Sequence, residues 1–186
     1  MGASVAEVAG LAAAGLQGDG NLNLIRIIRH LSSGDAAVRR AFPSRTLDAI
    51  EHAIRESETM HTGQIRFAVE PALDLIPLLA GQTAQQRAIE VFSQLRVWDT
   101  ECNNGVLIYL LLADRDVEIV ADRGVHTKVE KEAWEMVCHG MEVAFRNGKF
   151  EQGMLAGIRS VGQFLSHHYP HEGVKPNELP DRPVLM

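Results

Sequence analysis

Apolar side chains recur at every third or fourth position in five stretches of the chain, and this spacing predicts five helices. The clearest stripe consists of Trp134, Val137, Cys138, Met141 and Phe145. Two helices are expected to begin with a capping box, one from Thr83 to Gln86 and one from Thr127 to Glu130. The predicted helices occupy residues 24–31, 44–60, 84–95, 128–146 and 150–168.

Three other stretches have the pattern of strands. Between residues 64 and 69, apolar side chains alternate with less apolar ones, and this alternation predicts a strand. Residues 105–113 form a continuous branched apolar run, which predicts a strand covered on both faces. Asp114 and Arg115 then connect this strand to a return strand at 116–121. Helices before, between and after these strands predict an α/β fold, a three-layer α/β/α sandwich with a small mixed sheet flanked by helices on both faces.

The two ends of the chain lack this periodicity. Residues 1–21 are expected to form a flexible leader, residues 22–170 the folded domain, and residues 171–186, with three prolines, an extended tail. The helix at 24–31 is amphipathic and basic, with Arg26 and Arg29 mostly off its apolar face. We expect it to pack on its own domain, and contact with a membrane surface is the alternative.

Composition narrows the class of protein. With 46% hydrophobic and 23% charged residues, the chain can bury a substantial core. The net charge of −6 opposes binding to nucleic acid, and the longest apolar run is too short for a transmembrane segment. The N-terminus lacks the basic start of a secretory signal. The two cysteines form no C-x-x-C pair, so neither a disulfide framework nor a zinc site is expected. Two reduced thiols are typical of the cytoplasm, and we therefore expect a cytoplasmic protein.

Four aspartates bracket the predicted hairpin. At a rise of about 3.3 Å per residue, its two ends are roughly 20 Å apart, so the four carboxylates cannot form one site. Asp114 and Asp116 are expected to be solvated residues of the turn. The opposite end holds the candidate site, which comprises Asp99, Asn103, Asn104 and Asp122.

Three roles are open for this candidate site. Its carboxylate, amide and loop carbonyl oxygens are suitable ligands for Ca²⁺ or Mg²⁺. Neighbouring carboxylates could also act as acid and base, if the pKa of one were raised. In the third interpretation no ligand binds: Asp99 and Asn103 cap turns, and Asp122 pairs with Arg96 or Arg123.

A family resemblance rests on two quoted stretches. NNGVLIYLLLADRDVEIVADRG, residues 103–124, is followed by an amphipathic helix and then by FRNGKFEQGMLAGI, residues 145–158. This combination resembles the TPM domain family, which has an Asn-Asn-Gly-apolar strand, a charged turn, a return strand and a Gly-rich corner. HTGQIRFAVE at 61–70 is similar to the first strand of the family, and NELPDRP at 177–183 to the tail of a short bacterial subgroup. The resemblance covers residues 24–169.

Family members include thylakoid photosystem II repair factors and a nematode receptor-associated protein. Many have a signal peptide and a membrane anchor, and we expect neither here. The resemblance implies a role in assembly or repair, in receptor modulation, or in acid phosphatase chemistry. Bacterial members often lie beside LemA-type membrane proteins, which implies an envelope-associated protein partner of that type.

The sequence therefore leaves two functions open. It contains no P-loop, G-x-G-x-x-G, H-E-x-x-H or G-x-S-x-G motif. The first expectation is a non-enzymatic interaction or assembly-assisting module that requires no cofactor and lies in the cytoplasm or at the membrane periphery. The alternative is a divalent-cation-dependent, acid-phosphatase-like hydrolase that uses the acidic loop cluster.

Overall fold

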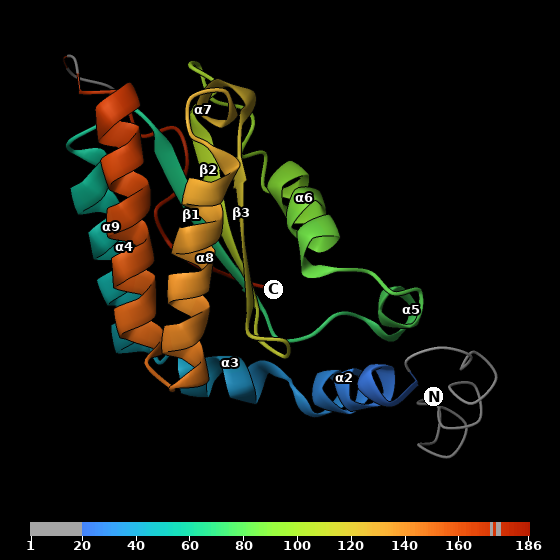
Figure 1. The fold of residues 1–186 in the computed structure, drawn as a ribbon. Helices are drawn as coiled ribbons and strands as arrows, with labels where there is room; N and C mark the ends of the chain where they lie inside the picture. Colours follow the sequence, from blue (N-terminus) through green and yellow to red (C-terminus); the bar gives the residue numbers. More distant parts are fainter. Residues whose placement is uncertain (1–19, 172, 174–175) are drawn as a thin grey trace.

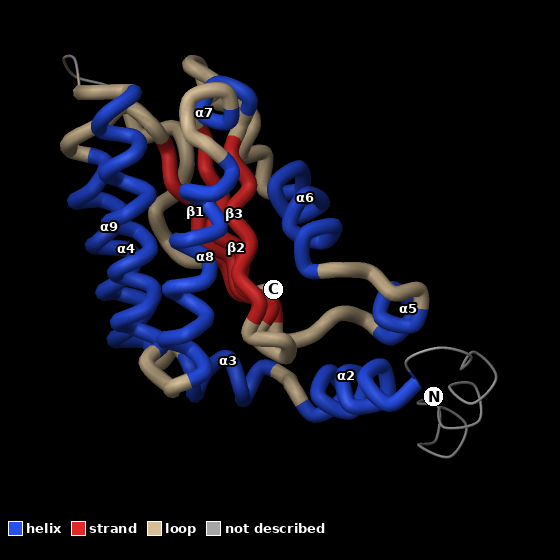
Figure 2. The backbone as a smooth tube through the Cα atoms, in the orientation of Figure 1, coloured by secondary structure: helices blue, strands red, loops and turns tan. Residues whose placement is uncertain are grey.

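The centre of the molecule is a four-stranded mixed sheet. The computed structural model describes residues 20–171, 173 and 176–186, so most of the expected leader lies outside the described residues. The strands follow the spatial order β3-β2-β1-β4, and β2 pairs parallel to β1 and antiparallel to β3 (Figures 1 and 2). The strands are β1 (Gln64–Glu70), β2 (Gly105–Leu111), β3 (Asp116–Ala121) and β4 (Val184–Leu185).

Helices cover both faces of this sheet (Figure 1). One face packs against α4 (Ser44–Glu58), α8 (Lys131–Arg146) and α9 (Phe150–His168), and the other against α6 (Ala84–Gln94). The remaining helices are α2 (Gly20–Ser32), α3 (Asp35–Ala41), α5 (Leu75–Leu79) and α7 (Arg123–His126).

Alternation along the strands produces the two buried layers, because successive side chains point to opposite faces. Phe67 and Ile108 are register partners and belong to the core beneath α4, α8 and α9. Ala68 and Tyr109, one residue further along, belong to the core beneath α6. The predicted three-layer α/β/α sandwich is confirmed.

The C-terminal segment is extended and is also part of the sheet. Val184 pairs in parallel with Ala68. Upstream, the Gln64 side-chain oxygen accepts hydrogen bonds from the backbone N–H groups of Glu178 and Leu179, each at 2.8 Å. The Arg66 guanidinium donates to the carbonyl of Pro180. These contacts tie the segment to β1 and cover its outer edge.

One of the two predicted capping boxes is confirmed and the other is wrong. The Thr83 capping box is present, with the side chains of Thr83 and Gln86 bonded reciprocally to each other's backbone N–H. The second capping box is wrong, since Thr127 ends α7 and α8 has Glu130 as its N-cap. The expected leader at residues 1–21 is also wrong at its last two residues, because α2 begins at Gly20. Within the described ranges, no helix combines the length and apolar character that a membrane crossing requires.

Candidate functional site

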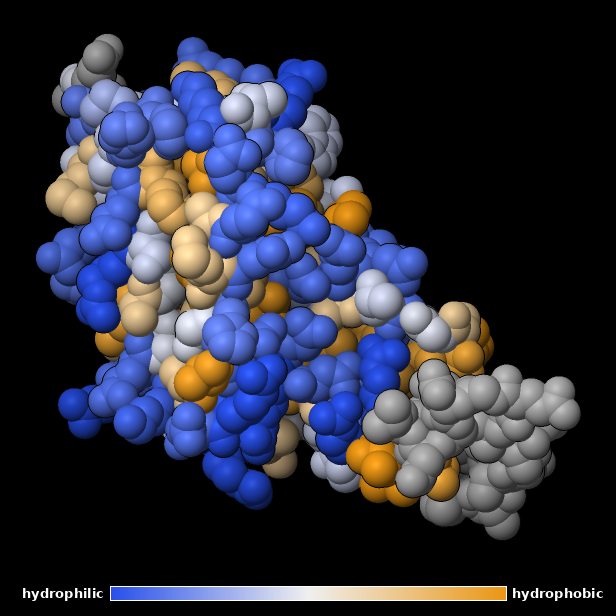
Figure 3. Space-filling view, in the orientation of Figure 1, coloured by the Kyte–Doolittle hydropathy of each residue, from blue (hydrophilic) through white to orange (hydrophobic). Residues whose placement is uncertain are grey.

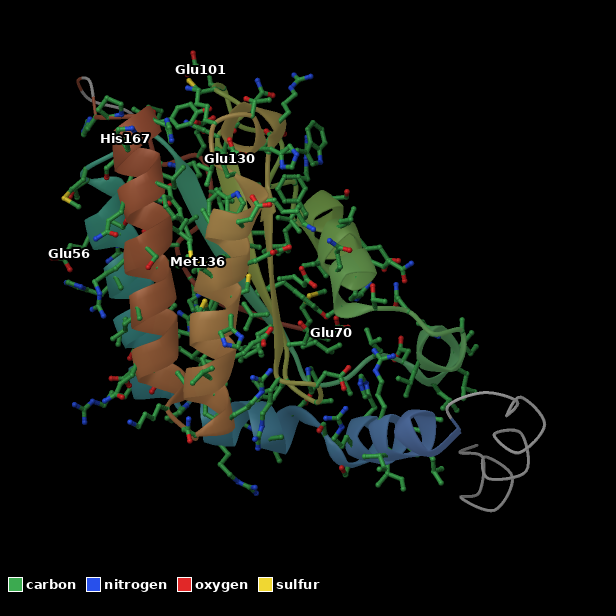
Figure 4. All side chains as sticks on the ribbon, viewed as in Figure 1. Glu56, Glu70, Glu101, Glu130, Met136 and His167 are labelled. Atoms are coloured by element: carbon green, nitrogen blue, oxygen red, sulfur yellow. The ribbon has the colours of Figure 1, made fainter. Side chains whose placement is uncertain are left out.

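The predicted site lies at one corner of the sheet, where β1 and β2 begin and β3 ends. The N–H of Asp122 donates to the carbonyl of Gly105 at 2.9 Å, and the N–H of Gly124 donates to the carbonyl of Asn103 at 3.1 Å. On the other side, the N–H of Gln64 donates to the carbonyl of Asn104 at 3.2 Å. These backbone bonds bring Asn103, Asn104 and Asp122 into one corner, at the end of the molecule that holds α7 and the labelled Glu101 (Figure 4).

Two glycines allow the loops of this corner to approach closely. A Cβ on Gly105 would lie 2.0 Å from the carbonyl oxygen of Val97, and a Cβ on Gly124 would lie 2.4 Å from that of Asn103. Neither distance is possible for a real side chain. The Asn-Asn-Gly and Asp-Arg-Gly triplets are therefore required by backbone packing at this corner.

Asn104 is fully buried and leaves one acceptor without a donor. Its Nδ2 donates to the carbonyl of Thr62 at 2.9 Å. Since a carbonyl can only accept, this bond fixes which end of the amide is nitrogen. Oδ1 is then buried with no hydrogen-bond partner among the described residues. An unpaired buried acceptor costs free energy unless water or a ligand meets it.

Asp122 presents a second oxygen of the same kind. It is the N-cap of α7, and Oδ1 accepts a hydrogen bond from the N–H of Arg123 at 2.7 Å. Oδ2 is buried and has no partner among the described residues. A carboxylate oxygen and an amide oxygen, both buried and lacking donors, are groups that a hard divalent cation coordinates well.

The other two candidate residues have local partners. The Asn103 side-chain oxygen accepts from Arg123 Nε at 3.1 Å. Asp99 pairs with Arg96 at 2.8 Å, and its side chain is 50% exposed. Among the described residues, no group of three or more His, Cys, Asp and Glu side chains could hold a metal ion. A cation at this corner would therefore depend on Asp122, with amide, backbone carbonyl or water oxygens as the remaining ligands.

The opposite end of the hairpin differs from the expectation. Asp114 is not a solvated turn residue, because it accepts hydrogen bonds from Arg26 Nε at 2.8 Å and Arg29 Nη2 at 2.9 Å. His30 Nε2 lies 3.1 Å from the same carboxylate, and His30 Nδ1 accepts from the N–H of Leu73, so Nε2 carries the proton that Asp114 accepts. Burial acts to raise the pKa of Asp114, but the bonds from Arg26 and His30 outweigh it and lower that pKa.

A buried serine–histidine pair was not predicted. Ser57 Oγ lies 2.9 Å from His61 Nε2, and His61 Nδ1 lies 3.1 Å from the carbonyl of Gly63. Nδ1 must donate to that carbonyl, so Nε2 accepts from the hydroxyl, as in a nucleophile–base pair. Burial lowers the pKa of His61 to about 4, which makes it a weak base at neutral pH. The i, i+4 spacing of Ser57 and His61 at a helix end was the available sequence signal.

The two cysteine thiols give little support for nucleophilic chemistry. Burial raises the pKa of Cys138 to about 12, with the charge of Glu118 adding to the effect. Cys102 is exposed beside the corner. A reactive cysteine needs an environment that stabilises the thiolate, and the surroundings of Cys138 do the opposite.

Comparison with known families decides the relationship of this chain. The family model described as the TPM domain matches residues 39–164. This chain belongs to the TPM domain family. The resemblance of residues 103–124 and 145–158 to that family is thus confirmed. A search of curated proteins gave no match.

Solved structures show the same TPM fold. The chain is similar to the BA42 protein from the psychrophilic bacterium Bizionia argentinensis, with 28% identity and a TM-score of 0.69, over 78% of this chain and 95% of that one. It also resembles the N-terminal domain of a P. gingivalis protein, with 17% identity and a TM-score of 0.56, over 75% and 95% of the two chains. The N-terminal domain of cg2496 from Corynebacterium glutamicum gives 12% identity and a TM-score of 0.50, over 73% and 81%.

Proposed function

We propose that this TPM domain is a non-enzymatic interaction module whose corner at Asn104 and Asp122 binds a hard divalent cation, Ca²⁺ or Mg²⁺. One observation supports the proposal above the others: Asn104 and Asp122, at the same corner of the sheet, each bury an acceptor oxygen that no described donor reaches. The family resemblance suggests a membrane-associated protein partner of the LemA type.

The chemistry of the corner favours weak binding that responds to calcium concentration. Of the two candidate carboxylates, Asp122 has a buried oxygen that no described donor reaches, whereas Asp99 is paired with Arg96 on the surface. Sites with little charge bind Ca²⁺ with dissociation constants of about 10⁻⁴ to 10⁻³ M. A bound cation would neutralise Asp122 and link the start of β2 to the start of α7, which stiffens the surface around the corner.

The nucleophiles support a non-enzymatic role. The Ser57 hydroxyl is hydrogen-bonded to His61, which is a weak base, and the pKa of Cys138 is far above neutrality. An acyl or phosphoryl transfer through either residue would require a nucleophile that is activated near neutral pH.

The test is a cation titration of chelator-treated protein by isothermal calorimetry and by NMR of the backbone amides. We expect saturable Ca²⁺ binding, with shifts centred on residues 103–105 and 122–125. Asp122→Asn keeps the size of the side chain and removes its charge, and should weaken binding by roughly tenfold or more. Asp99→Asn is the matched control and should change the affinity by less than about twofold, because this carboxylate is exposed and paired.

Two results would contradict the proposal. Absence of saturable binding by Ca²⁺ and Mg²⁺ in the wild type would remove the cation site. Cation-dependent hydrolysis of a phosphomonoester such as p-nitrophenyl phosphate, present in the wild type and lost in Asp122→Asn, would replace the non-enzymatic role with the phosphatase alternative.

A further inference from the structure

Helix α2 is bound to the domain mainly by its polar side, with Ile27 also packed against the core beneath α6. Arg26 and Arg29 donate to Asp114, and a second nitrogen of Arg26 donates to the carbonyl of Gln82 at 2.9 Å. His30, between Asp114 and Leu73, is 3% exposed. The charged face of this amphipathic helix therefore faces the protein.

The apolar side of α2 consequently faces outward. Its exposed residues share one face at helical spacing, and Figure 3 shows hydrophobic side chains along this helix. They are Leu24, Ile25, Ile28 and Leu31, with 43%, 50%, 57% and 58% of their surface exposed. A helix on a globular protein ordinarily has the reverse orientation, and a contiguous exposed apolar patch usually marks an interaction surface.

Basic residues gather beside this face, although the whole chain has a net charge of −6. Arg39 and Arg40 on α3 are exposed and form no ion pair with a described residue. A cleft of about 1120 Å³ adjoins α2 and α3. Its basic lining residues are Arg29, Arg40, Arg115, Arg146 and Lys149.

Among the described acidic groups near this cleft, Asp114 and Glu142 are paired with cations, whereas Asp35, Asp116 and Glu151 form no ion pair. Asp114 is held by α2, and Glu151 accepts a hydrogen bond from the hydroxyl of Thr46 at 2.6 Å. Glu142 is paired with Arg146, and Asp35 lies exposed in the first turn of α3. Arg40 and Lys149 have no such partner among the described residues, so positive charge at this end is only partly neutralised.

We propose that the end of the molecule formed by α2, α3 and the adjoining cleft docks on an anionic lipid bilayer. The apolar face of α2 lies among the headgroups and upper acyl chains, and the cations of α3 and the cleft contact lipid phosphates. An apolar helix face flanked by Lys and Arg is the combination that interfacial binding requires. A second copy of the chain fits less well, because a symmetric contact would bring two basic clusters together. The proposal does not depend on the cation corner, which lies at the opposite end of the sheet.

The experiment is co-sedimentation of the full chain with vesicles of phosphatidylcholine alone and of phosphatidylcholine mixed with phosphatidylglycerol. We expect binding to the mixed vesicles, weak or no binding to the neutral ones, and release by high salt. Ile25→Gln with Ile28→Gln should reduce binding roughly tenfold, because two exposed apolar groups that would enter the bilayer are removed. Arg39→Glu with Arg40→Glu should reduce it by at least about tenfold, since each cation near the surface contributes about 1 kcal/mol.

Matched controls use exposed residues on other elements. Met136, labelled on α8 in Figure 4, is 71% exposed and can be changed to Gln, and the exposed Arg159 on α9 can be changed to Glu. Both should bind as the wild type does, and circular dichroism should show that every variant is folded.

Three results would overturn the proposal. The first is no sedimentation of the wild type with mixed vesicles. The second is equal loss in the control and α2 variants. The third is a dimer, detected by light scattering, that Ile25→Gln with Ile28→Gln dissociates, since this would assign the face to a second copy of the chain.

Discussion

The two ends of the β2–β3 hairpin differ in whether their buried polar side chains find hydrogen-bond donors within the chain. At the turn, Asp114 is enclosed by Arg26, Arg29 and His30, so its charge is matched within the chain. At the other end, Asn104 and Asp122 each bury an oxygen with no described donor. Asp114 and Asp122 both follow a strand and look alike in the sequence, but one carboxylate is paired within the chain and the other keeps an oxygen without a described donor. The turn end is completed by α2, whereas the corner end is complete only when water or a cation meets its free oxygens.

The largest expected effect comes from the backbone of the corner. Gly105→Ala places a Cβ 2.0 Å from the carbonyl oxygen of Val97, so the loop before β2 must move. We expect a loss of about 3 kcal/mol in the free energy of unfolding, measured with urea. Gly140→Ala on α8, where nothing lies within 4 Å, is the control and should be neutral or stabilising by up to about 1 kcal/mol. Equal effects would mean that the corner is loosely packed.

The turn end is tested by removing the charge of Asp114. Asp114→Asn leaves two guanidinium groups facing a neutral amide, so α2 should detach more readily. We expect a loss of about 2 kcal/mol in unfolding free energy, discounted because Arg29 is half exposed. Limited proteolysis should cut earlier between α2 and α3. A loss below about 0.5 kcal/mol, the level of an exposed pair, would show that the enclosure contributes little.

Acid should weaken the corner end through His61. Its pKa in the folded protein is about 4, below the ordinary 6.5, mainly because it is buried. As the pH falls below 6.5, the unfolded chain takes up the proton before the folded one, so stability is lost between pH 6.5 and 4. At 1.36 kcal/mol per pKa unit the loss would reach about 3 kcal/mol, and relaxation of the folded protein around the protonated ring should reduce it to about 2 kcal/mol. His61→Gln should be less stable at neutral pH and should lack this acid-dependent loss; an unchanged slope would contradict the assignment.

Glu118, in the middle of β3, should give a smaller effect of opposite sign. Burial, and then the charges of Asp116 and Glu142, raise its pKa to about 7. The unfolded chain releases this proton first, so stability is lost as the pH rises from about 4.5 through 7. Glu118→Gln should therefore stabilise the protein by about 1 kcal/mol at pH 8, after discounting for solvent screening, and by almost nothing at pH 4. A pH-independent difference would point to packing instead.

The layers of the fold could be predicted from the sequence because they depend on local periodicity. The alternation at Ile65, Phe67 and Val69 marks one face of β1, and the run after Gly105 marks a strand buried on both faces. β4 could not be predicted in the same way, since two residues have no period and their pairing with Ala68 and Val69 spans more than a hundred positions. The false capping box at Thr127 arose because Asp122 starts a short helix just before it.

The candidate site was predictable in its location and not in its bonding. Pairing of β2 with β3 places Asp122 beside Gly105, the residue that follows Asn104. Which oxygens lack a donor depends on side chains such as Arg123, whose guanidinium donates a hydrogen bond to the side-chain oxygen of Asn103. The partners of Asp114 lie 84 to 88 residues away in sequence, so a prediction from turn chemistry alone assigned Asp114 to solvent.

The difference between the two ends of the hairpin is tested most directly by measuring how Ca²⁺ changes the unfolding free energy of three proteins. With calcium at about ten times the dissociation constant, the wild type and Asp114→Asn should each gain about 1.4 kcal/mol over chelator-treated protein. Asp122→Asn, with an affinity at least tenfold lower, should gain no more than about 0.4 kcal/mol. An equal gain in all three proteins, or no gain in the wild type, would show that the buried oxygens of the corner do not bind the cation.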